Sequence, residues 1–210
     1  GQIGDCWLVS AVDAIAARSP AALRSLFREN ADGTVTVTFH RFDHEAGRYL
    51  KDEVKVTRQV YQRQNGTPLY GSSTTGDAWF PLLEKAYAQW KGGYDGARSG
   101  YPYEAFEAIL GAAGRHYELD VTTADALWSI CERADNRREP MVGWTRLESP
   151  GLHFANSGLT QDHAYAILGA ETIDGKRFVK VRNPWGNNGW APSGGPLGIR
   201  PLDQGVLLVP

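Results

Sequence analysis

Cys6 is the residue whose type and position best suit nucleophilic chemistry in this sequence. It stands in the run Gly-Asp-Cys-Trp, directly ahead of a segment whose apolar residues recur at helical spacing. The N–H groups and the dipole at the start of a helix stabilise an anion, so a thiol there is expected to ionise readily. The alternative is that Cys6 is a small apolar core residue, as many cysteines outside disulfides are.

A histidine and an asparagine lie at the ends of two predicted strands. His163 heads an apolar run, and Asn183 ends the next one, with the turn pair Asp174-Gly175 between them. Antiparallel pairing would bring the Asn183 amide beside the imidazole. The ring could then accept a thiol proton while the amide oxygen orients it without adding charge. Trp185 is expected to shield this hydrogen bond from water. Taken singly, His163 also fits an ordinary strand-end histidine.

The remaining patterns predict the elements that must position these residues. Glycines at positions 92, 93, 96 and 100 favour a flexible crossing between two lobes. Before it the chain reads as mainly helical, and after Pro140 as antiparallel strands, which predicts an α+β fold. Helices are expected over residues 5–15, 19–27, 77–90, 102–114 and 123–131, and strands over residues 34–39, 49–56, 141–145, 163–172, 177–182 and 206–209.

Four motifs in a fixed order resemble the calpain (C2) family of papain-like cysteine proteases. They are GDCWL, WFPLLEKAYA, DHAYAILGA and VRNPWGNNGW, and the resemblance runs from residue 1 to about residue 190. It implies a papain-like two-lobed core with the cleft between the lobes. The helical first lobe, residues 1–102, would carry the nucleophile helix. The antiparallel β second lobe, residues 103–210, would carry the histidine and asparagine strands.

The resemblance also assigns roles to individual residues. Cys6 would be the nucleophile, His163 the general base and then acid, and Asn183 the orienting residue. Gly100 aligns with a glycine whose backbone binds an extended substrate, and Trp185 is the second candidate for substrate binding. The function implied is a cysteine endopeptidase that hydrolyses peptide bonds through an acyl-enzyme thioester.

The sequence departs from the family pattern near the nucleophile and the histidine. Asp162 stands where the family often has glycine, which would alter substrate binding or place a carboxylate near the imidazole. The family's oxyanion glutamine lies six residues before the nucleophile. Gln2 is only four residues before Cys6, so that position falls upstream of Gly1. Loss of one oxyanion donor typically costs about 10²–10³ in rate, so residues 1–210 alone are expected to be a weak enzyme.

Calcium is the one cofactor that the resemblance suggests. The proposed chemistry needs no cofactor, and calcium would act as a structural activator. Asp77 aligns with an acidic calcium ligand of the family, but it also fits a carboxylate at a helix start. Gly189 stands where an acidic ligand usually follows the second-lobe motif. The sequence therefore predicts no metal-binding residue.

Composition excludes several other classes. The 22 Lys and Arg residues nearly balance the 24 Asp and Glu residues, which argues against a nucleic-acid partner. No apolar run reaches the ~20 residues of a membrane-spanning helix. Two cysteines exclude a disulfide framework, and a bridge to Cys131 would consume the nucleophile. The expected partners are a protein or peptide substrate and further domains of a longer parent chain; the compartment is left open.

Two alternatives to the protease differ from it in chemistry. The first keeps the fold but transfers the acyl group to an amine or deamidates a side chain; Asn183 in place of an aspartate favours the protease. The second is a protein-binding module without catalysis. An intact set of Cys6, His163 and Asn183 argues against it.

Overall fold

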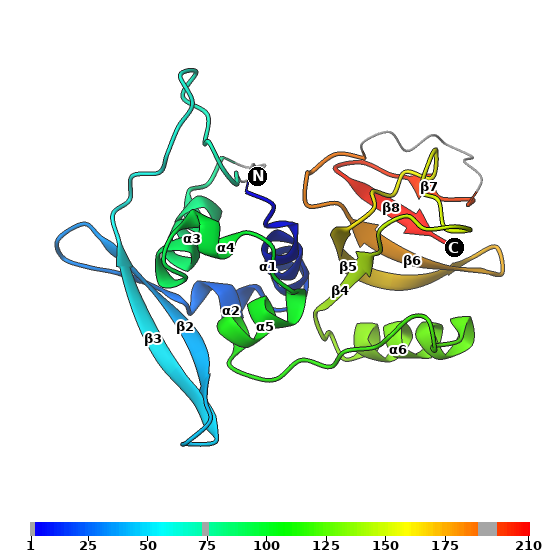
Figure 1. Cartoon of the computed structure of the whole chain (residues 1–210), viewed down its shortest axis with the longest axis horizontal. Helices are drawn as coiled ribbons and strands as arrows, with labels where there is room; N and C mark the ends of the chain where they lie inside the picture. The colour runs from blue at the N-terminus through cyan, green and yellow to red at the C-terminus, as the bar shows by residue number, and fades with distance from the viewer. Residues whose placement is uncertain (1–2, 73–75, 189–196) are drawn as a thin grey trace. The chain divides into compact units, whose positions relative to one another are not determined.

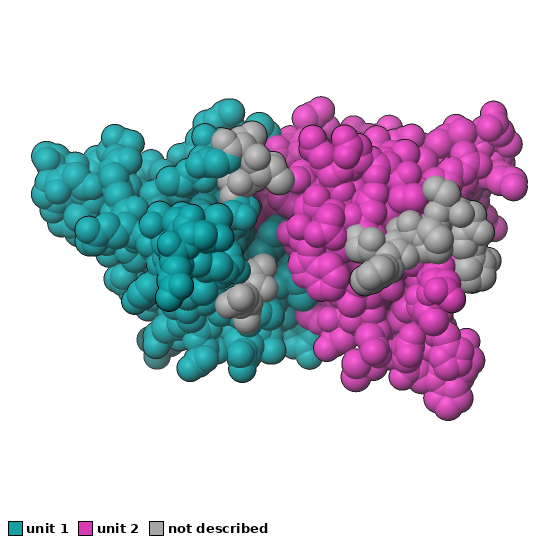
Figure 2. All heavy atoms as spheres, turned by 90° about the horizontal axis from the view of Figure 1, so that it is seen from above, with its two compact units in different colours: residues 1–9, 20–115 teal, residues 10–19, 116–210 magenta. Residues whose placement is uncertain are grey.

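The computed structural model describes residues 3–72, 76–188 and 197–210, which form two compact units (Figures 1 and 2). Unit 1 comprises residues 1–9 and 20–115, and unit 2 comprises residues 10–19 and 116–210. Helix α1 (Cys6–Arg18) therefore contributes to both units. The units differ from the predicted lobes at residues 10–19 and 103–115, and the lobe boundary between residues 102 and 103 stays a prediction.

Unit 1 combines helices with a three-stranded antiparallel sheet in the order β1-β2-β3. The long β2–β3 hairpin is prominent in Figure 1. Its strands are β1 (Phe27–Glu29), β2 (Val35–Asp43) and β3 (Arg48–Val56). Its helices, besides the start of α1, are α2 (Pro20–Arg24), α3 (Trp79–Trp90), α4 (Tyr94–Ala97) and α5 (Pro102–Leu110).

Aromatic side chains from three elements form the centre of unit 1. Tyr87 of α3 makes edge contacts with Trp7 of α1 and Phe39 of β2, at centroid distances of 5.6 and 5.4 Å. Phe39 also stacks on Trp90 at 5.2 Å. Edge-to-face and stacked pairs add to the free energy gained by burying these rings. The start of α1 is thereby packed against α3, which in turn packs against the sheet.

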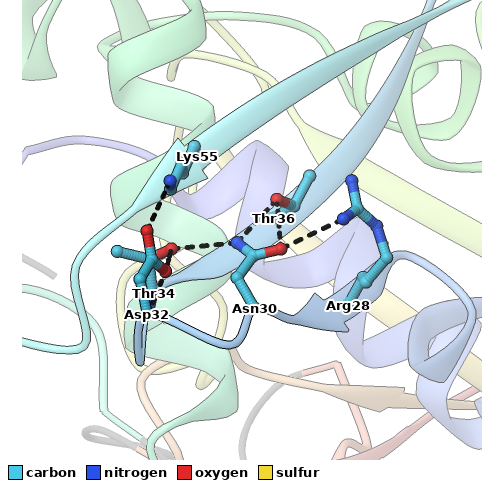
Figure 3. A network of polar contacts seen from close by, with 6 residues as sticks. All are labelled: Arg28, Asn30, Asp32, Thr34, Thr36 and Lys55. Carbon is cyan, nitrogen blue, oxygen red and sulfur yellow. Dashed lines mark hydrogen bonds and ion pairs between the residues drawn. The ribbon is translucent and has the colours of Figure 1, made fainter.

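A polar network ties the β1–β2 connection to β3 at the surface of unit 1 (Figure 3). The Asn30 amide donates to the hydroxyls of Thr34 and Thr36 at 2.9 and 3.0 Å. Lys55 of β3 pairs with Asp32 at 2.6 Å. Hydrogen bonds from Lys55 and Thr34 hold the pKa of Asp32 below its ordinary value. The network links the β1–β2 connection to β3, although such exposed pairs contribute little to stability.

Unit 2 is built on a five-stranded antiparallel sheet in the order β4-β5-β6-β8-β7. Helix α6 (Ala124–Asn136) packs against β5. The sheet core consists of Tyr165, Val181, Ile199 and Leu207. The strands are β4 (Met141–Thr145), β5 (His163–Ile173), β6 (Lys176–Arg182), β7 (Arg200–Pro201) and β8 (Val206–Val209).

The C-terminal part of α1 is bonded to this sheet within unit 2. The buried Ser10 hydroxyl donates to the carbonyl of Ala164 at 2.9 Å. Arg18 donates to the carbonyl of Leu168 and pairs with Asp135 of α6, both at 2.5 Å. These contacts fix both ends of the apolar run of β5, including the residue that follows His163.

The predicted α+β class and its antiparallel sheets are confirmed, with corrections to individual elements. The helix expected over residues 19–27 ends at Arg24, because Phe27 pairs with Val37 in a strand that the prediction missed. The helix from Pro102 ends before Gly111 rather than Gly114, since Gly111 adopts the left-handed conformation that closes a helix. Helix α4 and strand β7 were not predicted. No helix among the described residues could span a membrane.

Candidate active site

The candidate nucleophile lies at the first residue of α1. The Asp5 carbonyl accepts hydrogen bonds from the N–H groups of Leu8 and Val9 at 2.9 and 3.0 Å, which begins the helix at Cys6. Cys6 is half-buried, between the fully buried Asp5 and Trp7. A partly exposed thiol at a helix start has the environment of a reactive cysteine.

Cys131 has the opposite environment. It lies on α6 and is 2% exposed, as the predicted buried helix residue should be. Burial raises the pKa of its thiol, and the charge of Asp135 adds to the effect. The described residues contain no disulfide between Cys131 and Cys6. Of the two cysteines, Cys6 is therefore the one suited to nucleophilic attack.

Gly100 packs against the residue next to the nucleophile. A Cβ atom built on Gly100 would lie 2.6 Å from Cζ2 of Trp7. Real carbon contacts do not come so close, so only glycine allows this segment to lie against the indole. The Ser99 N–H also donates to the Gly4 carbonyl at 3.2 Å. Gly100 and the start of α1 are thus held together within unit 1.

The structure brings His163 and Asn183 together in unit 2, as the hairpin pattern predicted. His163 Nε2 lies 3.1 Å from Asn183 Oδ1. The Trp185 N–H donates to the same oxygen at 3.0 Å, which assigns that atom as the amide oxygen. An amide oxygen only accepts hydrogen bonds, so Nε2 must carry the proton and Nδ1 keeps its lone pair. The arrangement selects the tautomer with a basic Nδ1.

Aromatic rings enclose the imidazole on two sides. The Trp185 ring lies 4.5 Å from the His163 ring between centroids, and Tyr165 makes an edge contact at 5.0 Å. His163 is 4% exposed and Asn183 is 1% exposed, whereas Trp185 is 49% exposed. Trp185 therefore covers the imidazole and also presents surface to solvent, and its contact with a substrate stays a prediction.

Burial lowers the pKa of His163, and the Asn183 hydrogen bond and the Asp162 carboxylate oppose this only in part. The neutral ring, which can accept a proton, is favoured near neutral pH. Since the unfolded chain binds this proton more tightly, the His163 contribution to stability falls as the pH drops below about 6.5.

Asp162 and Thr145 are neighbours of His163, the first in the sequence and the second in the sheet. Asp162 has φ +48°, a conformation that suits the glycine often found there in the family, and its charge acts on the imidazole. Thr145, which sequence reasoning missed, accepts the His163 N–H at 3.0 Å and lies 2.5 Å from the Thr160 carbonyl. Thr145 pairs with His163 in the β4–β5 register, so a correct prediction of that register would have placed the two residues together.

Among the described residues, no group of three or more His, Cys, Asp or Glu side chains is arranged to hold a metal ion. The role of calcium stays a prediction. Asp77, the acid that aligns with a family ligand, lies just before α3, where it also suits a helix start. Gly189, which stands where the family usually has its second acidic ligand, lies outside the described residues.

Comparison with known proteins gives the class of this chain. The calpain family cysteine protease profile matches residues 1–194. Calpain-type cysteine protease DEK1 of Arabidopsis thaliana is 30% identical over 197 residues, which are 89% of this chain and 9% of that protein. Human calpain-12 is 31% identical over 90% of this chain and 27% of its own length. The human calpain-2 catalytic subunit is 27% identical over 90% of this chain and 28% of its own length.

The chain is similar in sequence to cysteine proteases over most of its length. It belongs to the calpain family. It spans less than a third of the length of each of these relatives.

Gly100→Ala tests the packing beside Cys6. Because the new methyl group would overlap the Trp7 indole, we expect a loss of about 1–3 kcal/mol in the free energy of unfolding, measured in urea. Gly114→Ala is the matched control, since its Cβ would meet only Tyr103 Cβ at an ordinary 3.7 Å. Equal stabilities of the two variants would contradict the close packing.

Trp185→Ala tests the cover over the imidazole. Removing the ring exposes His163 to water, so its pKa should rise toward about 6.5, as measured by NMR titration of the ring protons. Trp128→Ala, which removes an α6 indole that packs on Arg177, should leave it unchanged. An unchanged His163 pKa in Trp185→Ala would show that Trp185 does not desolvate the ring.

Proposed function

We propose that this chain is a calpain-type cysteine endopeptidase core that hydrolyses peptide bonds through Cys6, His163 and Asn183. The observation that carries the proposal is the hydrogen bond from His163 Nε2 to Asn183 Oδ1, which leaves Nδ1 as the base. Membership of the family supplies the class of reaction. The half-buried thiol at the start of α1 supplies the nucleophile.

The proposed reaction has two halves. His163 Nδ1 takes the Cys6 thiol proton, and Sγ attacks the peptide carbonyl carbon. The tetrahedral intermediate collapses to a thioester as the C–N bond breaks, and the imidazolium gives its proton to the leaving amine. Water then loses a proton to His163 and attacks the thioester. The thiolate leaves, the acid product is released, and the enzyme is restored.

The proposal includes the two-lobed papain-like plan of the family. In that plan residues 1–102 carry Cys6 and residues 103–210 carry His163 and Asn183. An extended peptide is the proposed substrate. Gly100, which has no side chain beside Trp7, would offer its backbone to that peptide, and the exposed part of Trp185 would contact it.

The oxyanion glutamine and the calcium of the family both concern how active residues 1–210 are by themselves. We propose that residues 1–210 alone turn over substrate slowly, because the family's oxyanion glutamine has no counterpart among them. Calcium enters the proposal only as a structural activator. No step of the reaction involves it.

The direct test is hydrolysis of a fluorescently labelled unfolded protein by the parent-length protein. Cys6→Ala should abolish hydrolysis, because no thioester can form, and His163→Ala should lower kcat by about 10²–10⁴-fold. Acid quenching followed by mass spectrometry should detect an acyl group on Cys6 in the wild type.

Cys131→Ala is the matched control, because the Cys131 thiol is buried on α6 and takes no part in the reaction. It should retain wild-type hydrolysis. Undiminished hydrolysis by Cys6→Ala would refute the proposal. A wild type that binds the unfolded protein but neither cleaves it nor forms an acyl-enzyme would favour a binding module.

A further inference from the structure

Two carboxyl groups lie buried together directly behind the candidate nucleophile. Asp5 precedes Cys6, and Glu84 projects from α3; each residue is 1% exposed. Their side chains are hydrogen-bonded to each other. A hydrogen bond between two carboxyl groups requires a proton on one of them, because a carboxylate can only accept hydrogen bonds, and two adjacent buried carboxylates would also repel. At least one member of the pair is therefore a carboxylic acid.

The surroundings of Glu84 are built to hold it in place. The Gly71 N–H donates to both Glu84 carboxyl oxygens, at 3.0 and 3.1 Å. A Cβ atom on Gly71 would lie 2.2 Å from Phe80 Cε1 and 2.9 Å from Glu84 Oε1. Only glycine lets the backbone approach so closely, so the Gly71 segment and α3 together fix the orientation of the Glu84 carboxyl group.

Burial, together with the neighbouring Asp5, raises the pKa of Glu84 to about 8, and the hydrogen bond from the Gly71 N–H opposes this only in part. Tyr94 of α4 also faces the pair, and Tyr70 stacks on Tyr94 at 4.1 Å. Burial and the charges of Glu84 and Asp5 raise the pKa of the Tyr94 hydroxyl, so this tyrosine stays protonated near neutral pH. One oxygen of Asp5, Oδ2, is buried without a hydrogen-bond partner among the described residues.

We propose that Glu84 is a positioning residue for Cys6. Its carboxyl group shares a hydrogen bond with the Asp5 carboxyl group and so fixes the residue at which α1 begins. The backbone of Asp5 accepts the first hydrogen bonds of α1, from Leu8 and Val9. Releasing the Asp5 side chain would loosen this first turn and displace the thiol, and small displacements of a reacting group cost large factors in rate. The inference rests on the proposed nucleophilic role of Cys6.

The test compares Glu84→Gln with Glu84→Leu. Glutamine keeps an N–H donor for Asp5 and an acceptor for Gly71, whereas leucine keeps neither. The rate of Cys6 alkylation by iodoacetamide, followed by peptide mapping near neutral pH, should stay close to wild type in Glu84→Gln. It should fall about tenfold or more in Glu84→Leu. In peptide hydrolysis the leucine variant should lose kcat while KM changes little.

Gln89→Leu is the matched control on the same helix, because it removes an exposed hydrogen bond to the Lys55 carbonyl on a different face. It should alkylate at the wild-type rate. Wild-type alkylation by a folded Glu84→Leu variant, or equal impairment of Glu84→Gln and Glu84→Leu, would overturn the proposal.

A second measurement decides the matter even if Glu84→Leu does not fold. As wild-type Glu84 loses its proton above about pH 8, the pair gains a negative charge and loses the proton of its hydrogen bond, so the start of α1 should loosen. The ratio of Cys6 alkylation rates, wild type over Glu84→Gln, should therefore drop above that pH. A constant ratio would overturn the proposal. Neither measurement depends on turnover, so failure of the protease proposal would show separately, as absence of hydrolysis by the wild type.

The free energy of unfolding should also depend on the ionisation of Glu84. Between the ordinary pKa of about 4.5 and the raised value of about 8, folded Glu84 keeps a proton that the unfolded chain has lost. The contribution of Glu84 to the free energy of unfolding therefore falls as the pH rises through this range. Glu84→Gln should remove that part of the pH dependence.

Discussion

The chemistry of the histidine depends on the orientation of one side-chain amide. Asn183 Oδ1 accepts two hydrogen bonds, from the Trp185 backbone and from His163 Nε2, and this decides which ring nitrogen is basic. The Asn183 backbone is itself fixed, because its N–H donates to the Gly205 carbonyl at 2.9 Å. Rotating the amide by half a turn would present N–H groups to both donors. The buried surroundings of Asn183 make that rotation costly.

The thiol depends on a different kind of constraint, which is close packing around the start of a helix. Trp7 is held between Gly100 and Tyr87, and Asp5 is held by Glu84, so the residues on both sides of Cys6 are buried while Cys6 is not. Burial fixes the backbone, and partial exposure leaves the sulfur accessible. This combination distinguishes Cys6 from Cys131, which is fixed but inaccessible.

The sequence alone predicted the features that depend on local pattern. The contact of His163 with Asn183 followed from two apolar strands joined by a turn pair, and the start of α1 followed from helical spacing. Features that depend on contacts distant in sequence were missed. Strand β1 forms because Phe27 pairs with Val37, and the Asp5–Glu84 pair joins residues far apart in the chain. The spacing of apolar residues along the sequence does not predict such long-range contacts. The roles of Cys6, His163 and Asn183 in catalysis stay predictions.

The central claim is that His163 acts on the Cys6 thiol, and the pH dependence of Cys6 alkylation tests it most directly. Iodoacetamide labelling with peptide mapping separates Cys6 from Cys131, and the parent-length protein is compared with its His163→Ala variant. The account predicts that wild-type Cys6 reacts well below the ordinary thiol pKa of about 8.5 and that His163→Ala loses this reactivity. A Cys6 that titrates as an ordinary thiol in both proteins would contradict it.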